Sequence, residues 1–257
     1  MESLKELWNY RQMIRSLVKK ELRTRYKGSV LGFLWTFVNP LLQLLVYSVI
    51  FALIMRIPIE NYAMYLFVGL VPWLFCSTSI TSGSVSVIAS AGLVQKIYFP
   101  RLILPIVSVS SNFMNMLFSF IIVVIALFAT GVGVSWYICF LPLIMVIEFI
   151  FVLGLVFIFS ALTVYLRDLE HLLGIFTMAW FYLTPILYSI DMIPDRFKAI
   201  AYANPMTSII VFYRNILFDK VMPQFSTLIT TVIFSVALVI IGYLLFQKLQ
   251  RRFAEEL

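Results

Sequence analysis

Residues 28–55 of this chain read GSVLGFLWTFVNPLLQLLVYSVIFALIM, and this stretch between Lys27 and Arg56 contains no charged side chain. Similar uncharged runs occupy residues 61–95, 102–147, 149–166, 172–190 and 221–247. A helix of about 20 apolar residues spans the hydrocarbon core of a bilayer, whereas an ionised side chain at its centre costs about 2.5–3.5 kcal/mol. The pattern therefore predicts an integral membrane protein made of helices.

The composition of the whole chain agrees with this prediction. Of its 257 residues, 62% are hydrophobic and 12% are charged, and the mean hydropathy is +1.01. We predict one all-α transmembrane domain over residues 1–257, because the uncharged runs leave no room for a large soluble domain. Residues 131–135 (GVGVS) divide the longest run. The six predicted spans are residues 31–55, 62–86, 104–130, 136–166, 172–189 and 226–247.

The distribution of basic residues predicts the orientation. With the amino terminus inside, 14 of the 19 Lys and Arg residues fall on the inner face. The positive-inside rule then places both termini in the cytoplasm. The net charge of +7 reflects this orientation. No nucleic-acid partner is expected, because the basic residues flank spans instead of forming a stripe on a soluble surface.

Residues 1–27 have the pattern of an amphipathic helix lying along the inner leaflet. Its apolar face is expected to carry Leu4, Leu7, Ile14, Val18 and Leu22, and its polar face Lys5, Lys20, Arg23 and Lys27. A segment with this pattern binds at the membrane interface. The alternative is a basic leader that only directs the topology of the first span.

The connection over residues 190–225 is too apolar for a solvated loop. We expect short re-entrant helices, broken at Asn204 and Pro205, because backbone at membrane depth is tolerated when protein buries it. The alternative is a short helix resting on the outer surface. Pro72 and Pro185 remove backbone donors inside the second and fifth spans, so kinks are expected there.

Few side chains in this chain suit catalysis. The sequence contains no GxxxxGK[ST] phosphate loop and no Cys/His cluster, and we predict neither ATP hydrolysis nor a bound cofactor or metal for this chain. Cys76 and Cys139 lie in apolar runs and are expected to be buried. Glu148 is the one carboxylate well inside a span. It is a functional candidate, with a structural hydrogen bond to a neighbouring helix as the alternative.

Aromatic side chains concentrate in the first and fifth spans. The candidates for lining a channel are Trp35, Tyr47, Phe51, Trp180, Tyr182 and Tyr188. Lipid contact explains most such residues. Those that point inward would offer flat faces along which sugar rings can slide.

The inner loop between the second and third spans contains the sequence AGLVQKIYFPR over residues 91–101. Lys96, Tyr98, Phe99 and Arg101 are expected to present aromatic and basic anchors to a soluble partner. An ordinary charged turn is the alternative.

Several short motifs together give the chain a family resemblance. They are residues 25–35 (RYKGSVLGFLW) with 39–41 (NPL), 69–73 (GLVPW), 96–101 (KIYFPR), 165–168 (YLRD) and 204–206 (NPM). In this order the chain resembles the membrane subunit of type-2 ABC exporters for cell-surface polysaccharides, which carry O-antigen, capsule or teichoic acid. The motifs do not separate these branches.

The resemblance implies a bacterial inner-membrane permease that pairs with a second copy of itself. Two copies of a separate ATPase, which binds ATP and Mg, would dock beneath it, with the loop from Leu93 to Arg101 as the coupling element. The cargo would be a lipid-linked polysaccharide, and O-antigen is the expected type. Its lipid pyrophosphate would be admitted near Arg25 and Lys27, where basic residues attract phosphate at the inner leaflet.

Two other classes of protein remain as alternatives. A membrane-embedded glycan or lipid transferase would need an acidic and His cluster at one membrane face, and the sequence offers only Arg167, Asp168, Glu170 and His171. A proton-coupled or drug-exporting carrier would depend on Glu148.

Overall fold

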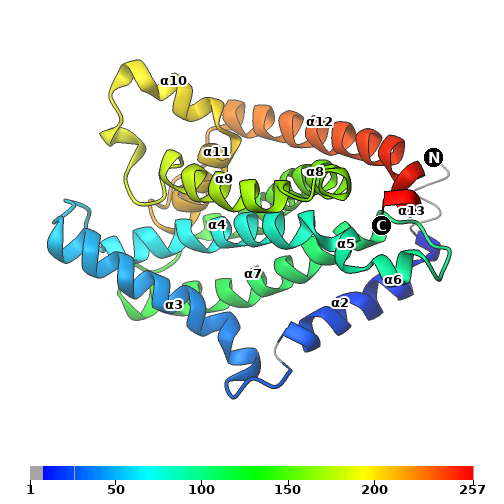
Figure 1. Cartoon of the computed structure of the whole chain (residues 1–257). Helices are drawn as coiled ribbons and strands as arrows, with labels where there is room; N and C mark the ends of the chain where they lie inside the picture. The colour runs from blue at the N-terminus through cyan, green and yellow to red at the C-terminus, as the bar shows by residue number, and fades with distance from the viewer. Residues whose placement is uncertain (1–7, 26, 257) are drawn as a thin grey trace.

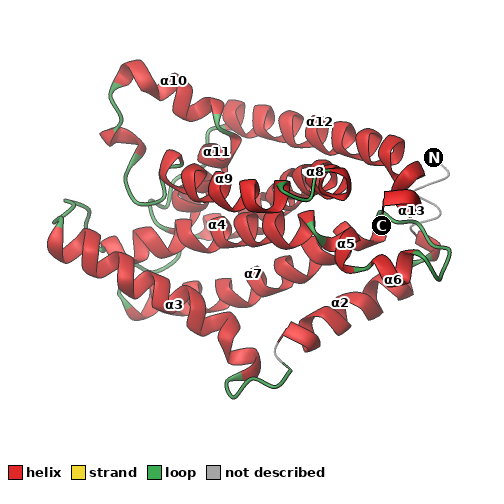
Figure 2. Ribbon diagram, viewed as in Figure 1, coloured by secondary structure: helices red, strands yellow, loops and turns green. Residues whose placement is uncertain are grey.

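The computed structural model describes residues 8–25 and 27–256, and in this part of the chain every element is a helix (Figure 2). The longer helices are α2 (Arg11–Arg25), α3 (Trp35–Ser48), α4 (Tyr62–Ser84), α7 (Ile103–Ala129), α8 (Leu141–Tyr165), α9 (Leu169–Leu183), α10 (Asp195–Ala203), α11 (Pro205–Leu217) and α12 (Phe225–Leu249). The short ones are η1 (Gly32–Leu34), η2 (Val49–Ile54), α5 (Ser86–Ala89), α6 (Ala91–Val94), η3 (Trp136–Phe140), η4 (Ile190–Met192), η5 (Gln250–Arg252) and α13 (Phe253–Glu256). The predicted all-α membrane fold class is confirmed.

Five helical segments are long and apolar enough to cross a membrane. They are Gly32–Ala52, Tyr62–Ser84, Ile103–Ala129, Trp136–Tyr165 and Phe225–Arg252. The predicted fifth span, residues 172–189, overlaps α9, which begins three residues earlier and ends at Leu183. The 15 residues of α9 extend about 22 Å at 1.5 Å per residue. This length is less than the hydrocarbon core of about 30 Å. The sixth crossing therefore stays a prediction.

Helix α4 forms the centre of the bundle (Figure 1). It packs against α3, α7, α8, α9 and α11, and most of its side chains are buried. A helix that is apolar on all sides is stable where other helices surround it. Helices α3 and α12 lie outside and bury few of their side chains, as expected of surfaces that contact lipid.

Two glycines bring α8 and α12 into close contact. A Cβ atom at Gly154 would lie 2.7 Å from the Val239 nitrogen, and one at Gly242 would lie 2.5 Å from the Gly154 carbonyl oxygen. These distances are too short for any side chain. The pair thus lets the two backbones touch, which is how small residues promote helix packing in membranes.

The chain does not form a kinked span at Pro185. Helix α9 ends at Leu183, and Thr184 adopts an extended conformation with φ −97° and ψ 135°, as expected for a residue that precedes proline. The expected kink at Pro185 is therefore wrong, whereas α4 continues through Pro72.

The connection after η4 contains two short helices that meet at Asn204, as the sequence predicts. The Asn204 side chain caps α11 by accepting from the Met206 backbone N–H at 3.1 Å. Helix α11 is almost wholly buried in the bundle, whereas α10 has no buried residue. Protein thus surrounds α11, which is the condition for a re-entrant helix; its depth in the membrane stays a prediction.

Helix α2 lies along α7 at the edge of the bundle (Figure 1). Its side chains Ile14, Val18 and Leu22 are half-buried, whereas Lys20 and Arg23 are exposed. The helix is therefore amphipathic, and its placement at the membrane interface stays a prediction. Leu4, Leu7 and Lys5 of the predicted pattern lie outside the described residues.

Candidate functional site

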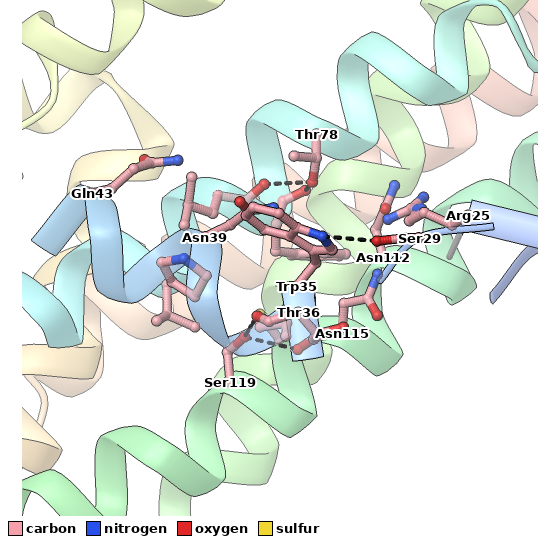
Figure 3. Close-up of a pocket in the computed structure, with 15 residues that line it drawn as sticks. Arg25, Ser29, Trp35, Thr36, Asn39, Gln43, Thr78, Asn112, Asn115 and Ser119 are labelled. Carbon is pink, nitrogen blue, oxygen red and sulfur yellow. Dashed lines mark hydrogen bonds between the residues drawn. The ribbon is translucent and has the colours of Figure 1, made fainter. Parts of the chain in front are cut away.

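Three spans leave a polar cavity of about 560 Å³ between them (Figure 3). Helices α3, α4 and α7 line it, and we call it the amide cavity after the Asn and Gln side chains of α3 and α7. Its polar lining consists of Arg25, Ser29, Trp35, Thr36, Asn39, Gln43, Thr78, Asn112, Asn115 and Ser119. Polar groups inside apolar spans are costly unless they bond or face a cavity. The concentration therefore marks a candidate binding site.

Helical spacing explains why these side chains converge. Asn39 and Gln43 are four residues apart on α3, and Asn112, Asn115 and Ser119 follow at intervals of three and four on α7. Residues at such spacing share one face of a helix. Sequence analysis missed this set, although the periodicity of polar residues inside otherwise apolar spans carried the signal.

The hydrogen bonds of the cavity leave two acceptors unused. The Ser82 hydroxyl donates to the Thr78 carbonyl at 2.7 Å, so it accepts from Asn112 Nδ2 at 2.9 Å. Asn112 Oδ1 and Asn115 Oδ1 are both buried and have no hydrogen-bond partner among the described residues. An unpaired buried acceptor costs about 1–3 kcal/mol. A ligand rich in hydrogen-bond donors would remove that cost if the Asn112 or Asn115 side chain rotated to turn its carbonyl oxygen toward the cavity.

Of the two basic residues predicted to admit a pyrophosphate, only Arg25 borders the cavity. Its Nη2 lies 3.5 Å from Glu21 Oε1, and the other carboxylate oxygen, Oε2, accepts from the Ser111 hydroxyl at 3.1 Å. Burial raises the pKa of the Glu21 carboxyl, and Arg25 and Ser111 partly offset this. Glu21 thus links α2 to α7, a role that sequence analysis missed. Lys27 is exposed on the following turn.

Only one of the six candidate channel aromatics borders the amide cavity. Trp35 lies in the middle of the polar group and donates to Ser29 Oγ at 3.0 Å (Figure 3). Tyr47 stacks on Phe181, with ring centroids 5.5 Å apart. Phe51 packs on the border of the main core cluster.

The remaining candidates belong to the region around α9. Trp180 packs edge to face on Trp73 and donates to Asn204 Oδ1 at 3.0 Å. The Tyr188 hydroxyl donates to the Tyr182 carbonyl at 3.0 Å, and the Tyr182 ring is exposed. These residues join α9 to α4 and α11, and they do not border this cavity.

The inner loop divides into exposed and buried side chains. Tyr98 is 90% exposed and Lys96 is also exposed, whereas Leu93 is half-buried. Phe99 is 5% exposed and packs in a core cluster with Leu102 and Phe253. The expectation that Phe99 presents its ring to a partner is therefore wrong for this conformation.

Arg101 also turns inward. Its Nη1 donates to the Gln250 carbonyl, and its guanidinium lies 5.9 Å from the Phe253 ring centroid. A hollow of about 590 Å³ remains between this loop and Gln247, Gln250 and Arg251. Arg101 therefore joins the loop to the end of α12 instead of projecting as a free anchor.

Glu148 is fully buried and accepts a hydrogen bond of 2.6 Å from the Tyr213 hydroxyl on α11. Its other oxygen, Oε1, has no partner among the described residues. Tyr213 in turn stacks on Phe120, with centroids 5.1 Å apart. The bond joins α8 to α11, which is the structural alternative considered for this residue.

Arg214 is a buried residue whose role sequence analysis missed. Its Nη2 donates to the Ile186 carbonyl at 2.6 Å, its Nη1 also donates to the Pro185 carbonyl, and the guanidinium lies 3.6 Å from the Tyr65 ring centroid. The charge pattern places Arg214 among the five Lys and Arg residues of the outer face, which gave no sign of this burial. Arg214 fixes the loop after α9 against α4.

The described residues contain no group of three or more His, Cys, Asp or Glu that fits a metal ion. Cys76 is buried, but Cys139 is exposed on η3, so the expectation that both are buried is wrong for Cys139. His171 is exposed beside Glu170. The candidate functional site is the amide cavity between the helices, with the Arg25 cation at its edge.

Comparison with known proteins assigns the chain to a family. Residues 12–218 match the family described as ABC-2 type transporter. The chain is 35% identical to the O-antigen export system permease protein RfbA of Myxococcus xanthus, over 99% of this chain and 98% of the relative. It is 37% identical to RfbA of Klebsiella pneumoniae, over 98% of this chain and 99% of the relative.

A more distant relative is the polysialic acid transport protein KpsM of Escherichia coli, at 24% identity over 82% of each chain. The match to the family covers most of the chain and includes the spans that enclose the amide cavity. The chain belongs to the ABC-2 type transporter family of membrane proteins.

Proposed function

We propose that this chain is the permease subunit of an ATP-driven ABC exporter that moves a lipid-linked O-antigen across the bacterial inner membrane. The observation that carries the proposal is the 35–37% identity to O-antigen export permeases over nearly the full length. A cavity of amides and hydroxyls inside the spans supports it, because sugar hydroxyls both donate and accept hydrogen bonds.

In this proposal two copies of the chain and two copies of an ABC ATPase form the exporter. ATP and Mg bind in the ATPase, which docks on the loop from Leu93 to Arg101. Lys96 and Tyr98 are exposed for that contact. Arg101 and Phe99 join the same loop to the end of α12, so a push on the loop moves both the α7 and α12 sides of the bundle. Both termini lie in the cytoplasm.

The cargo enters from the inner leaflet. Arg25, at the edge of the amide cavity, and Lys27, on the next turn, attract the pyrophosphate of the lipid carrier. The first sugars then meet the Trp35 ring and the amides of Asn112 and Asn115. Apart from Arg25 the polar lining is uncharged, so it forms hydrogen bonds of modest net strength with sugar hydroxyls, and a long polymer can move past.

The export assay uses the chain in its own host. Deleting the chain should abolish surface O-antigen and leave lipid-linked polymer inside, and its return should restore export. The double variant Asn112→Ala with Asn115→Ala should lower export severalfold while the complex with the ATPase still assembles, because it removes donors and acceptors for the sugar. Asn215→Ala on α11, away from the cavity, is the control. Surface O-antigen that does not depend on the chain would overturn the proposal.

Glu148 distinguishes the proposal from a proton-coupled carrier. Gln at position 148 still accepts from Tyr213, so Glu148→Gln should retain export and its dependence on ATP. Loss of all transport at normal assembly, with no ATPase isolated alongside the chain, would favour a carrier instead.

A further inference from the structure

Helix α2 carries a row of three exposed cations along one edge. Arg15, Lys19 and Arg23 follow each other at intervals of four residues, so they lie on one side of the helix. All three are exposed, and none forms an ion pair with the described residues. The neighbouring Lys20 lies on the other edge with Glu21, beside a second hollow that faces α6.

The row of cations borders an apolar groove of about 800 Å³ between α2, η1, α7 and α8. Its lining includes Val18 and Leu22 of α2, Phe33 of η1, Phe113 and Met114 of α7, and Phe149 of α8. Phe113 packs edge to face on Phe149 with centroids 5.1 Å apart, and Phe33 packs likewise on Phe118. Three aromatic rings, those of Phe33, Phe113 and Phe149, thus line the same groove as the cations.

This groove is separate from the amide cavity, since α7 presents different residues to each. Phe113 and Met114 face the groove, whereas Asn112, Asn115 and Ser119 line the cavity. Arg25 belongs to the cavity and is paired with Glu21. Arg15, Lys19 and Arg23 therefore border a different hollow from the one that Arg25 borders.

We propose that the groove binds one anionic glycerophospholipid of the inner leaflet. The acyl chain lies along the phenylalanine rings, and Arg15, Lys19 and Arg23 hold the phosphate. Charge complementarity favours an anionic headgroup, since three exposed cations with no ion pair to the described residues stand beside an almost wholly apolar groove. A peptide would need partners for its backbone amides, which this lining does not offer. The bound lipid fills the space between α2 and the α7–α8 pair.

The test measures lipid retention by the complete exporter, that is, this chain with its ATPase. The complex is reconstituted in phosphatidylcholine vesicles that contain phosphatidylglycerol, re-extracted in detergent, and examined by native mass spectrometry. The unchanged complex should retain phosphatidylglycerol over phosphatidylcholine. Removing one cation near an anionic lipid should weaken retention on the order of fivefold, and removing all three roughly a hundredfold.

Two neighbouring lysines provide the matched pair. Lys19→Gln should lose phosphatidylglycerol, whereas Lys20→Gln, with the same charge change on the other edge of the helix, should retain it. Val146→Trp, at the exposed rim of the groove, should also lower retention although every cation remains. Four results would each overturn the proposal. The two lysine variants could lose phosphatidylglycerol equally, neither could lose it, Val146→Trp could retain it fully, or the retained species could have the mass of a polyprenyl pyrophosphate.

Discussion

Arg214 illustrates how one residue organises the end of the bundle at which α9 finishes. It is 3% exposed, and it donates to carbonyls of the loop after α9 while resting on the Tyr65 ring. Gly69 makes room for it, because a Cβ there would lie 3.1 Å from Arg214 Nη2 and 3.3 Å from Ile210 Cγ2. The glycine of the GLVPW motif is thus explained by the close approach of a guanidinium.

Gly69→Ala should therefore destabilise the protein by about 1–3 kcal/mol, the usual cost of overpacking a filled core. The measurement is thermal unfolding of the purified chain in detergent. Gly174→Ala is the matched control, because that helical glycine has no atom within 4 Å of a new Cβ. The control should be neutral or slightly stabilising. Equal behaviour of the two variants would contradict the role of Gly69.

At the scale of the element, the inner loop combines a surface for contact with a fixed base. Tyr98 and Ile97 are exposed, whereas Phe99 and Leu102 are buried in the core cluster that includes Phe253 of α13. Phe99 and Tyr98 are neighbours, but one is buried and the other exposed. Substitution of Phe99 therefore tests the stability of the fold, and substitution of Tyr98 tests the contact with the ATPase.

Phe99→Ala should lower stability by about 3–5 kcal/mol through the cavity that it leaves. Tyr98→Ala should change stability by less than about 0.5 kcal/mol, but it should weaken association with the ATPase. Thermal unfolding and co-purification of the ATPase measure the two effects. A stable Phe99→Ala variant, or a Tyr98→Ala variant that holds the ATPase normally, would contradict the division of the loop.

Over the whole molecule, hydrogen bonds between loops and helix ends show which connections lie together at each end of the bundle. At one end, the Tyr165 hydroxyl donates to the Leu249 carbonyl at 2.8 Å and Arg101 donates to Gln250. At the other end, Lys220 donates to the Val132 carbonyl. These are the segments that the charge pattern assigns to the inner and outer faces respectively, so the grouping agrees with the predicted topology.

The orientation itself is tested with single cysteines in a Cys139→Ser background, since Cys139 is exposed. In spheroplasts, a membrane-impermeant maleimide should label Arg196→Cys on α10 and leave Gln95→Cys in the inner loop unlabelled. Both positions should react once the membranes are opened. The reverse pattern would place the termini outside.

Charge is excluded from the bilayer, so the uncharged runs alone predicted the membrane class and, α9 apart, the ends of the spanning helical segments to within about five residues. The Asn-Pro pair likewise predicted the break at Asn204. The fold was needed to show which polar faces meet in the amide cavity, that Phe99 and Arg101 turn inward and that Arg214 is buried. Hydropathy measures the tendency of a side chain to leave water and does not say what then surrounds it. Lipid and protein interior are equally apolar, so the pattern along a span does not distinguish the face that packs from the face that contacts lipid.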